Sequence, residues 1–215
     1  MTKNVNYVAV LADVVGSRAL PRKQRAELQD DLRSALRTQV NRRRLWQPHI
    51  AAGFAISGGD EIEGLLTDPS IVWDIAHWLR YTFADVDWIV ACARGPITTA
   101  LAPTAVEVDG PCFHAAREAL EEAKTRRQIF ILRGFSPTVD ALSSYYSALY
   151  WSWTPRQRRQ ASRFRLDGPA LDTLKERLKV HPTAVSHMKR RMAWPLVAEG
   201  DRMLRAALGA TGEAR

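Results

Sequence analysis

The order of hydrophobic patterns along the first 136 residues constrains the fold of this chain more than any other feature. Short apolar runs of the kind that forms strands occur at residues 6–12, 51–57, 61–66, 86–99 and 127–134. Longer segments of helical periodicity separate most of them. The resulting order, strand, helix, hairpin, helix, strand, helix, strand, predicts an α+β sandwich. We expect an antiparallel sheet with helices on one face and the first strand beside the hairpin.

Local signals mark several of these elements. The apolar positions of the first helix recur at helical spacing and define one face: Leu28, Leu32, Ala35, Leu36 and Val40. Gly58-Gly59-Asp60 is typical of a tight hairpin turn. Asp68-Pro69-Ser70 is typical of a helix start, and Pro111 lies near the start of a further predicted helix at 109–124.

The composition is that of a globular protein, with 215 residues of which 46% are hydrophobic and 25% charged. We expect two domains, 1–136 and 137–215, the second opening with a linking helix at 137–153. The chain has no run of about 18 apolar residues and no secretory signal, so we expect a cytoplasmic protein without a membrane span. Cys92 and Cys112 lack metal-type spacing and are expected to be reduced, buried thiols.

The positive charge is concentrated at the C-terminal end of the chain. Residues 1–150 contain 17 Lys and Arg against 17 Asp and Glu, whereas residues 151–215 contain 14 against 6. The whole net charge of +8 therefore lies in the last third. This asymmetry favours a neutral domain followed by one that binds a polyanion, although a basic tail can also be only a solvated surface.

Acidic residues follow two of the predicted strands. Asp13 ends the first strand and Asp60 lies at the tip of the hairpin, so the two carboxylates converge if these strands are neighbours. Convergent carboxylates repel each other unless a cation lies between them. With no His or Cys nearby, oxygen ligands favour Mg²⁺ or Mn²⁺. The loop Val14–Arg18 leads from strand to helix, where backbone N–H groups suit a phosphate, and Gly16 permits close approach.

Four motifs in this order resemble the palm domain of nucleotide cyclases. "LADVVGSR" is similar to the opening of the class III palm, and "GGDEI" differs from the GGDEF motif of diguanylate cyclases only at its last residue. "RGPITT" and "DGPCFHAAREAL" resemble the later Gly-containing strand and the Ala-Ala-Arg helix of the cyclases. Taken together, over roughly residues 7–133, the chain most resembles the SatD family. The resemblance implies a ferredoxin-like palm with a βαββαβ core.

The resemblance also implies roles for individual residues. Asp13 and Asp60 would bind two metal ions, with Glu61 in support, and Arg117 would stabilise the phosphoryl transition state. A triphosphate would lie along five consecutive loop residues: Val14, Val15, Gly16, Ser17 and Arg18. Two features depart from the pattern. Phe113 replaces the cyclase Asn, and the first helix lacks the Asn and Asp that read guanine, which argues against cyclic dinucleotide synthesis.

Each of these residues also has an ordinary structural interpretation. Asp13 could cap a helix, Asp60 could be a turn residue, and Glu61 and Glu63 could lie on the solvent side of a strand. Arg117 could pair with Glu121 one helical turn later. Taken singly these interpretations are as good as the functional ones, but together they leave the order of the motifs unexplained.

The last third of the chain predicts a helical nucleic-acid-binding domain. An aromatic-rich helix at 139–153 should pack this part on the first domain, and Thr154-Pro155 should begin a basic helix. Residues 171–194 have the spacing of a helix-turn-helix, with Leu174, Leu178 and Val180 before the second helix at 182–193. Its partner-facing residues are Ala184, Val185, Met188 and Met192. Its outward, DNA-binding candidates are Thr183, Ser186, His187, Lys189, Arg190 and Arg191.

Two functions from different classes remain open. In the first, the protein is a DNA-binding regulator, binding double-stranded DNA as a homodimer, whose palm binds a divalent metal and possibly a nucleoside triphosphate. In the second, the palm is a Mg²⁺- or Mn²⁺-dependent nucleotidyl cyclase or nucleotidyltransferase that the basic domain localises on nucleic acid. The palm could also be only a scaffold, and the C-terminal helices could form a bundle for protein contacts. We favour the DNA-binding regulator because its helix-turn-helix pattern is the better formed.

Overall fold

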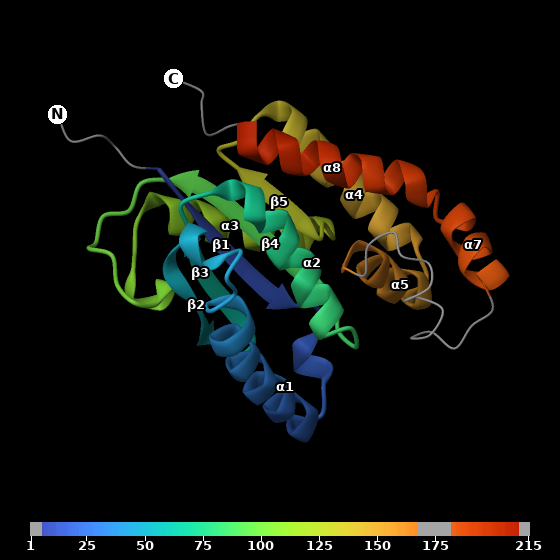
Figure 1. Cartoon of the computed structure of the whole chain (residues 1–215). Coiled ribbons are helices and arrows are strands. Elements are labelled where there is room, and N and C mark those ends of the chain that lie inside the picture. The colour runs from blue at the N-terminus through green and yellow to red at the C-terminus, as the bar shows by residue number, and fades with distance from the viewer. Residues whose placement is uncertain (1–5, 167–181, 211–215) are drawn as a thin grey trace.

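A computed structural model of the chain describes residues 6–166 and 182–210. Its centre is a five-stranded sheet flanked by helices (Figure 1). The strands lie side by side in the order β2-β3-β1-β4-β5. Their bounds are β1 Tyr7–Val14, β2 Ile50–Gly58, β3 Glu61–Leu66, β4 Trp88–Gly95 and β5 Phe130–Arg133. The mixed α+β class, the order of the elements and the position of the first strand beside the hairpin were all predicted from the sequence.

The helices begin where capping residues and prolines place them. Asp68 accepts a hydrogen bond from the Ser70 backbone at 2.8 Å, and Thr154 and Gln157 form a reciprocal capping box. The bounds are α1 Arg22–Ala35, α2 Val72–Thr82, α3 Pro111–Arg126, α4 Pro137–Ser152, α5 Pro155–Leu166, α7 Pro182–Arg191 and α8 Trp194–Ala210. A π-helical turn, Leu36–Val40, extends α1, so the predicted apolar face from Leu28 to Val40 is continuous.

The sheet is mixed, and the prediction of an antiparallel sheet is wrong at one edge. β1 pairs antiparallel with both β3 and β4, and β2 pairs antiparallel with β3 through the two-residue turn Gly59-Asp60. β5, however, runs parallel to β4. The reason is the connection: α3 carries the chain back to the end of the sheet where β4 began, and a strand that starts there runs in the same direction.

Helices cover both faces of the sheet, which corrects the prediction that they cover one. On β1, Val8, Val10 and Ala12 pack in the cluster formed with α1 and α2, while Ala9 and Leu11 pack against α3. A strand that is covered on both faces is apolar at every position and shows no alternation. The sequence "YVAVLA" carries this signal, and the continuous apolar run is what requires a second helical layer.

The C-terminal helices share the core of the first helical layer. Tyr146 and Tyr150 of α4 are buried with Trp73 of α2 and Phe130 of β5, which confirms the predicted packing role of the aromatic helix. His77 lies among the same rings, with its centroid 4.6 Å from that of Trp73. α8 packs beside α4 (Figure 1).

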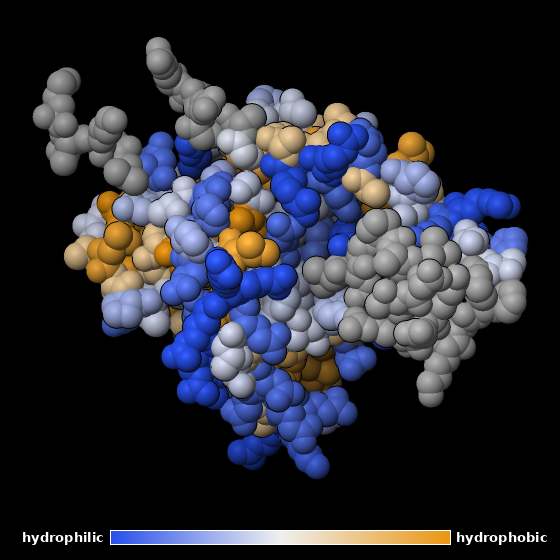
Figure 2. Space-filling view, viewed as in Figure 1, coloured by the Kyte–Doolittle hydropathy of each residue, from blue (hydrophilic) through white to orange (hydrophobic). Residues whose placement is uncertain are grey.

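The surface differs between the ends of the molecule. Hydrophilic residues cover most of the face in Figure 2, whereas apolar side chains gather over the loop between β4 and α3, where Leu101 and Val106 are exposed. Cys92 and Cys112 are buried free thiols, as predicted. None of the helices within the described ranges is long and apolar enough to cross a membrane.

Candidate functional site

Four acidic residues meet where β1 ends and β3 begins. In the antiparallel pairing of the two strands, Leu11 lies opposite Glu63 and Ala12 opposite Ile62, which brings Asp13 beside Glu61. Successive side chains of a strand point to opposite faces of the sheet, so Glu61 and Glu63 of β3 share one face. Asp13 of β1 lies on the same face, which is the face that α3 covers. Asp60 precedes them in the hairpin turn, where Gly59 adopts the positive φ of 61° that the turn requires. The strand order alone therefore assembles the acidic cluster, defined as Asp13, Asp60, Glu61 and Glu63.

Asp60 is the most unusual member of the acidic cluster. It is only 8% exposed, and its Oδ2 atom has no hydrogen-bond partner among the described residues. Burial raises the pKa of Asp60, and repulsion from Asp13 adds to this effect, while hydrogen bonding from the Ser17 hydroxyl opposes it. A buried carboxylate oxygen without a donor destabilises the fold unless its charge is compensated.

Helix α3 supplies cations to the other acids. Lys124 Nζ lies 2.9 Å from Asp13 Oδ2 and 2.8 Å from Glu121 Oε1. Burial acts to lower the pKa of Lys124, but its hydrogen bonds to Glu121 and Asp13 outweigh burial and leave that pKa raised. Arg117 Nη2 lies 2.7 Å from Glu63 Oε1, so its partner is Glu63 and not the Glu121 considered in the structural interpretation. Sequence reasoning missed Lys124, although its position seven residues after Arg117 places both on one helix face.

Glu61 completes the acidic cluster, and Phe113 is an apolar residue where the cyclases have a polar one. Burial raises the pKa of Glu61, and the neighbouring Glu63 charge adds to this, with Lys124 acting against it. Phe113, the residue that replaces the cyclase Asn, is buried between α3 and the sheet and offers no polar atom to a ligand. Within the described ranges, no group of three or more His, Cys, Asp or Glu side chains is placed to hold a metal ion.

The predicted phosphate loop does not lead directly into a long helix. Residues Ser17–Ala19 form a single 3₁₀ turn, and α1 begins only at Arg22. Pro21 explains the break, because the residue before a proline is driven out of the helical region, and Leu20 is extended with ψ 138°. Gly16 has φ 71°, and the Val15 amide donates to the Asp87 carbonyl. Val15, Gly16 and Arg18 are exposed beside the acidic cluster, and Ser17 is half-buried.

Comparison with known proteins identifies the family. The sequence model of the SatD family matches residues 7–128, which is more than half of the chain. The chain belongs to the SatD family. The match includes the whole acidic cluster and α3, and it ends before α4. One similar solved structure, described as that of a bacterial light-regulated adenylyl cyclase, is 10% identical over 60% of this chain and 75% of that chain, with a TM-score of 0.40. No curated protein matches the chain.

A second group of charged residues lies on α5 and α7, outside the family match. Two arginines of α5 are turned inward and paired: Arg158 with Asp87 at 3.2 Å, and Arg165 with Asp201 at 2.5 Å. Six other cations of these helices have no carboxylate within ion-pair distance in the part of the chain that the structure describes. This outer basic surface consists of Arg156, Arg159, Arg163, Lys189, Arg190 and Arg191.

Helix α7 presents most of the predicted DNA-binding residues outward. Five of the six are exposed: Thr183, Ser186, His187, Arg190 and Arg191. Lys189 is half-buried and lies 4.9 Å over the Phe164 ring. Val185 and Met192 are buried as expected and Met188 is half-buried, but Ala184 is exposed because it faces a groove of about 540 Å³ shared with Arg156 of α5. Leu174, Leu178 and Val180, in the predicted first helix of the helix-turn-helix, lie outside the described residues.

Proposed function

We propose that this SatD-family chain is a regulatory protein that binds duplex DNA through α5 and α7. The observation that carries the proposal is the set of six cations on the outer basic surface for which the described residues provide no carboxylate. The two inward-facing arginines of α5 are paired with carboxylates, Arg158 with Asp87 and Arg165 with Asp201. Like charges gathered on two adjoining helices repel each other, and a polyanion relieves that repulsion.

The distribution of side-chain types on α7 supports the same conclusion. Short polar residues, Thr183 and Ser186, precede Arg190 and Arg191 on the exposed side of the helix. Short hydroxyl side chains suit contacts with base edges, and arginines suit phosphates or guanine. Helix α7 also lies at the end of the molecule farthest from the β2 edge of the sheet (Figure 1), where a duplex would meet little steric hindrance from the sheet.

The test is fluorescence anisotropy of a labelled duplex of about 20 base pairs, titrated with the full chain at several salt concentrations. We expect affinity to fall steeply with salt. The triple variant Arg156→Gln, Arg190→Gln, Arg191→Gln should bind at least about 100-fold more weakly at low salt, with a salt slope shallower by about three. The matched control, Arg22→Gln, Arg42→Gln, Arg44→Gln, removes the same charge from exposed positions near α1. Equal weakening by both triples, or no binding by the wild type at low salt, would refute the proposal.

A second candidate function rests on Asp60. We propose that Mg²⁺ or Mn²⁺ binds between Asp13 and Asp60, with Glu61 beside it, and that a nucleoside triphosphate lies along residues 14–18. The chemistry of the side chains suits these metals, because carboxylates supply hard oxygen ligands and Asp60 Oδ2 has no partner among the described residues. The three carboxylates are not placed as a three-ligand group in the described structure, so Asp13 and Asp60 would hold the ion together with phosphate oxygens. Lys124 occupies one side of Asp13, and it must leave Asp13 for a metal to take both carboxylates. A bound metal would neutralise charge on the phosphates during phosphoryl transfer.

This candidate is tested by titrating Mn²⁺ and following the signal of the free ion by electron paramagnetic resonance. Lys124→Gln should bind Mn²⁺ more tightly than the wild type, because the competing ammonium is gone. Asp60→Asn should abolish binding. The shift in melting temperature with each nucleoside triphosphate then reports nucleotide binding. Chromatography of the same mixtures shows whether the nucleotide is converted into a product. Mn²⁺ binding that Asp60→Asn leaves unchanged would exclude the acidic cluster as the site.

A further inference from the structure

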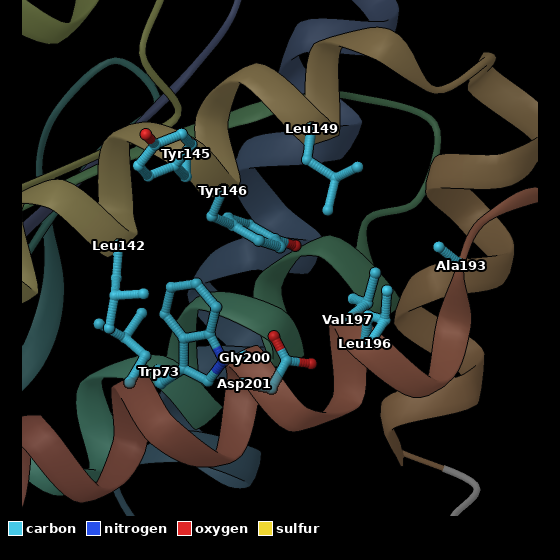
Figure 3. A pocket seen from close by; sticks show the side chains of 11 residues that line it. Trp73, Leu142, Tyr145, Tyr146, Leu149, Ala193, Leu196, Val197, Gly200 and Asp201 are labelled. Atoms are coloured by element: carbon cyan, nitrogen blue, oxygen red, sulfur yellow. The ribbon is translucent and has the colours of Figure 1, made fainter.

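A cavity of about 350 Å³ lies between α4, α8 and α2, away from both the acidic cluster and the outer basic surface. Figure 3 shows its side chains arranged around an open centre, with those of α4 on one side, those of α8 on the other and Trp73 of α2 between them. Most of the walls are apolar. The aliphatic lining residues are Leu142, Leu149, Leu196, Val197 and Leu204.

The polar groups of the cavity wall are two buried hydrogen-bond donors and one carboxylate that is already paired. Trp73 is 1% exposed and Tyr146 is 8% exposed. The Trp73 indole N–H has no hydrogen-bond acceptor among the described residues, and the Tyr146 oxygen lies beside the Arg165 guanidinium, so that the Tyr146 O–H proton is still available for donation. The one acidic wall residue, Asp201, already accepts two hydrogen bonds from Arg165, at 2.5 and 3.1 Å. Its charge is therefore compensated within the protein. A bound molecule would find two buried donors and no unpaired charge.

A glycine in the wall provides an independent indication. Gly200 lies within α8, where glycine is the least favourable ordinary residue apart from proline. A Cβ atom at this position would meet nothing within 4 Å, although Gly200 lines the cavity. Packing therefore does not require a glycine here. Its absent side chain keeps space open between Trp73 and α4, as a binding site for a small molecule requires.

We propose that this cavity binds a small, uncharged, mainly apolar molecule, aromatic or short-chain acyl, that carries a hydrogen-bond acceptor. The volume lies within the range of small-molecule sites, and the lining of apolar walls with a few convergent donors is typical of them. The acceptor receives hydrogen bonds from Trp73 Nε1 and the Tyr146 hydroxyl. A charged ligand is disfavoured, because the Arg165–Asp201 pair leaves no charge to compensate it.

The probe for this site is 6-propionyl-2-dimethylaminonaphthalene, a neutral aromatic ketone whose emission shifts to the blue in apolar surroundings. The full chain should give a saturable blue shift with one site per chain. Gly200→Leu fills the cavity and should weaken binding at least about tenfold. Gly209→Leu adds the same side chain to the same helix outside the cavity, next to Ser70, and should bind as the wild type does. Circular dichroism checks that each variant is folded.

A finer variant tests the hydrogen bonds. Tyr146→Phe removes one buried hydroxyl without changing the ring, and it should weaken binding of the ketone by about three- to tenfold. The proposal is overturned if the wild type shows no saturable shift, or if Gly200→Leu binds as tightly as Gly209→Leu. It is equally overturned if light scattering shows that Gly200→Leu converts a dimer into a monomer, because the cavity would then lie in the contact surface between two copies of the chain.

Discussion

The interior of the molecule and its outer basic surface use charge in opposite ways. Inside, Arg165 meets Asp201 and Arg158 meets Asp87. On α5 and α7, six cations, four of them exposed and two half-buried, meet no carboxylate of the described chain. Paired buried charges fix helices in position, whereas unpaired exposed charges contribute little to folding and are available to another molecule. Substitutions inside should therefore change stability and leave DNA affinity unchanged, and substitutions outside should do the reverse.

The largest effect is expected from the Arg165–Asp201 pair. Its side chains are 8% and 12% exposed, so Asp201→Ala leaves a buried guanidinium without a carboxylate to compensate its charge. We expect a loss of about 3–5 kcal/mol in the free energy of unfolding, measured by urea denaturation. The double variant Arg165→Met, Asp201→Leu removes both charges and should recover most of the loss. A loss below about 1 kcal/mol for Asp201→Ala would show that this pair does not fix α5 against α8.

A smaller effect is expected at the edge of the acidic cluster. Arg117 is half-exposed, but its partner Glu63 has a side chain that is only 6% exposed. Arg117→Ala removes a charged hydrogen bond from a buried carboxylate and should lower the free energy of unfolding by about 1–3 kcal/mol. Adding Glu63→Gln to this variant should restore part of the loss. If the second substitution has no effect, the 2.7 Å contact between Arg117 and Glu63 does not contribute to stability.

The buried histidine predicts a pH dependence. Burial, and then the charges of Arg165, Arg80 and Arg205, hold the pKa of His77 well below its usual 6.5. Unfolded chains take up a proton near pH 6.5 and folded chains do not, so stability falls as the pH drops below that value. The slope approaches about 1.4 kcal/mol per pH unit. Urea denaturation between pH 7 and pH 5 measures it. His77→Phe should flatten the slope, and an unchanged slope in this variant would assign the dependence to other groups.

The smallest effect on stability is expected on the outer basic surface. Arg190 is exposed on α7, so Arg190→Gln should change the free energy of unfolding by less than about 0.5 kcal/mol. Its affinity for duplex DNA should nevertheless fall by about three- to tenfold, because one phosphate contact is lost. The opposite result, lower stability with unchanged DNA affinity, would remove the distinction between the two regions.

Much of the fold could be predicted because it depends on local signals. Periodicity and capping residues marked the helices, and the Gly58-Gly59-Asp60 turn marked the hairpin. The prediction that β1 lies beside this hairpin was enough to predict that Asp13 and Asp60 lie close together. The parallel direction of β5 and the second helical layer were not predicted, since an apolar strand such as "IFIL" does not show which neighbour it takes.

Long-range contacts were the other part that sequence reasoning could not supply. Lys124 approaches Asp13 across more than a hundred residues of sequence, and the two side chains have no shared local pattern. The cavity beside Trp73 depends on how α4 and α8 are spaced, and that spacing results from the packing of many side chains. Gly200 offered a sequence signal only in retrospect, as an unfavourable residue inside an otherwise good helix.

The central position of β1 has a consequence for synthesis on the ribosome. Tyr7–Val14 is synthesised before the other described strands, yet it pairs with β3 and with β4, which ends at Gly95. An apolar strand without its neighbours is prone to aggregate, and domains that depend on distant pairings fold slowly. The nascent chain must therefore keep β1 from aggregating until the residues up to Gly95 have left the exit tunnel.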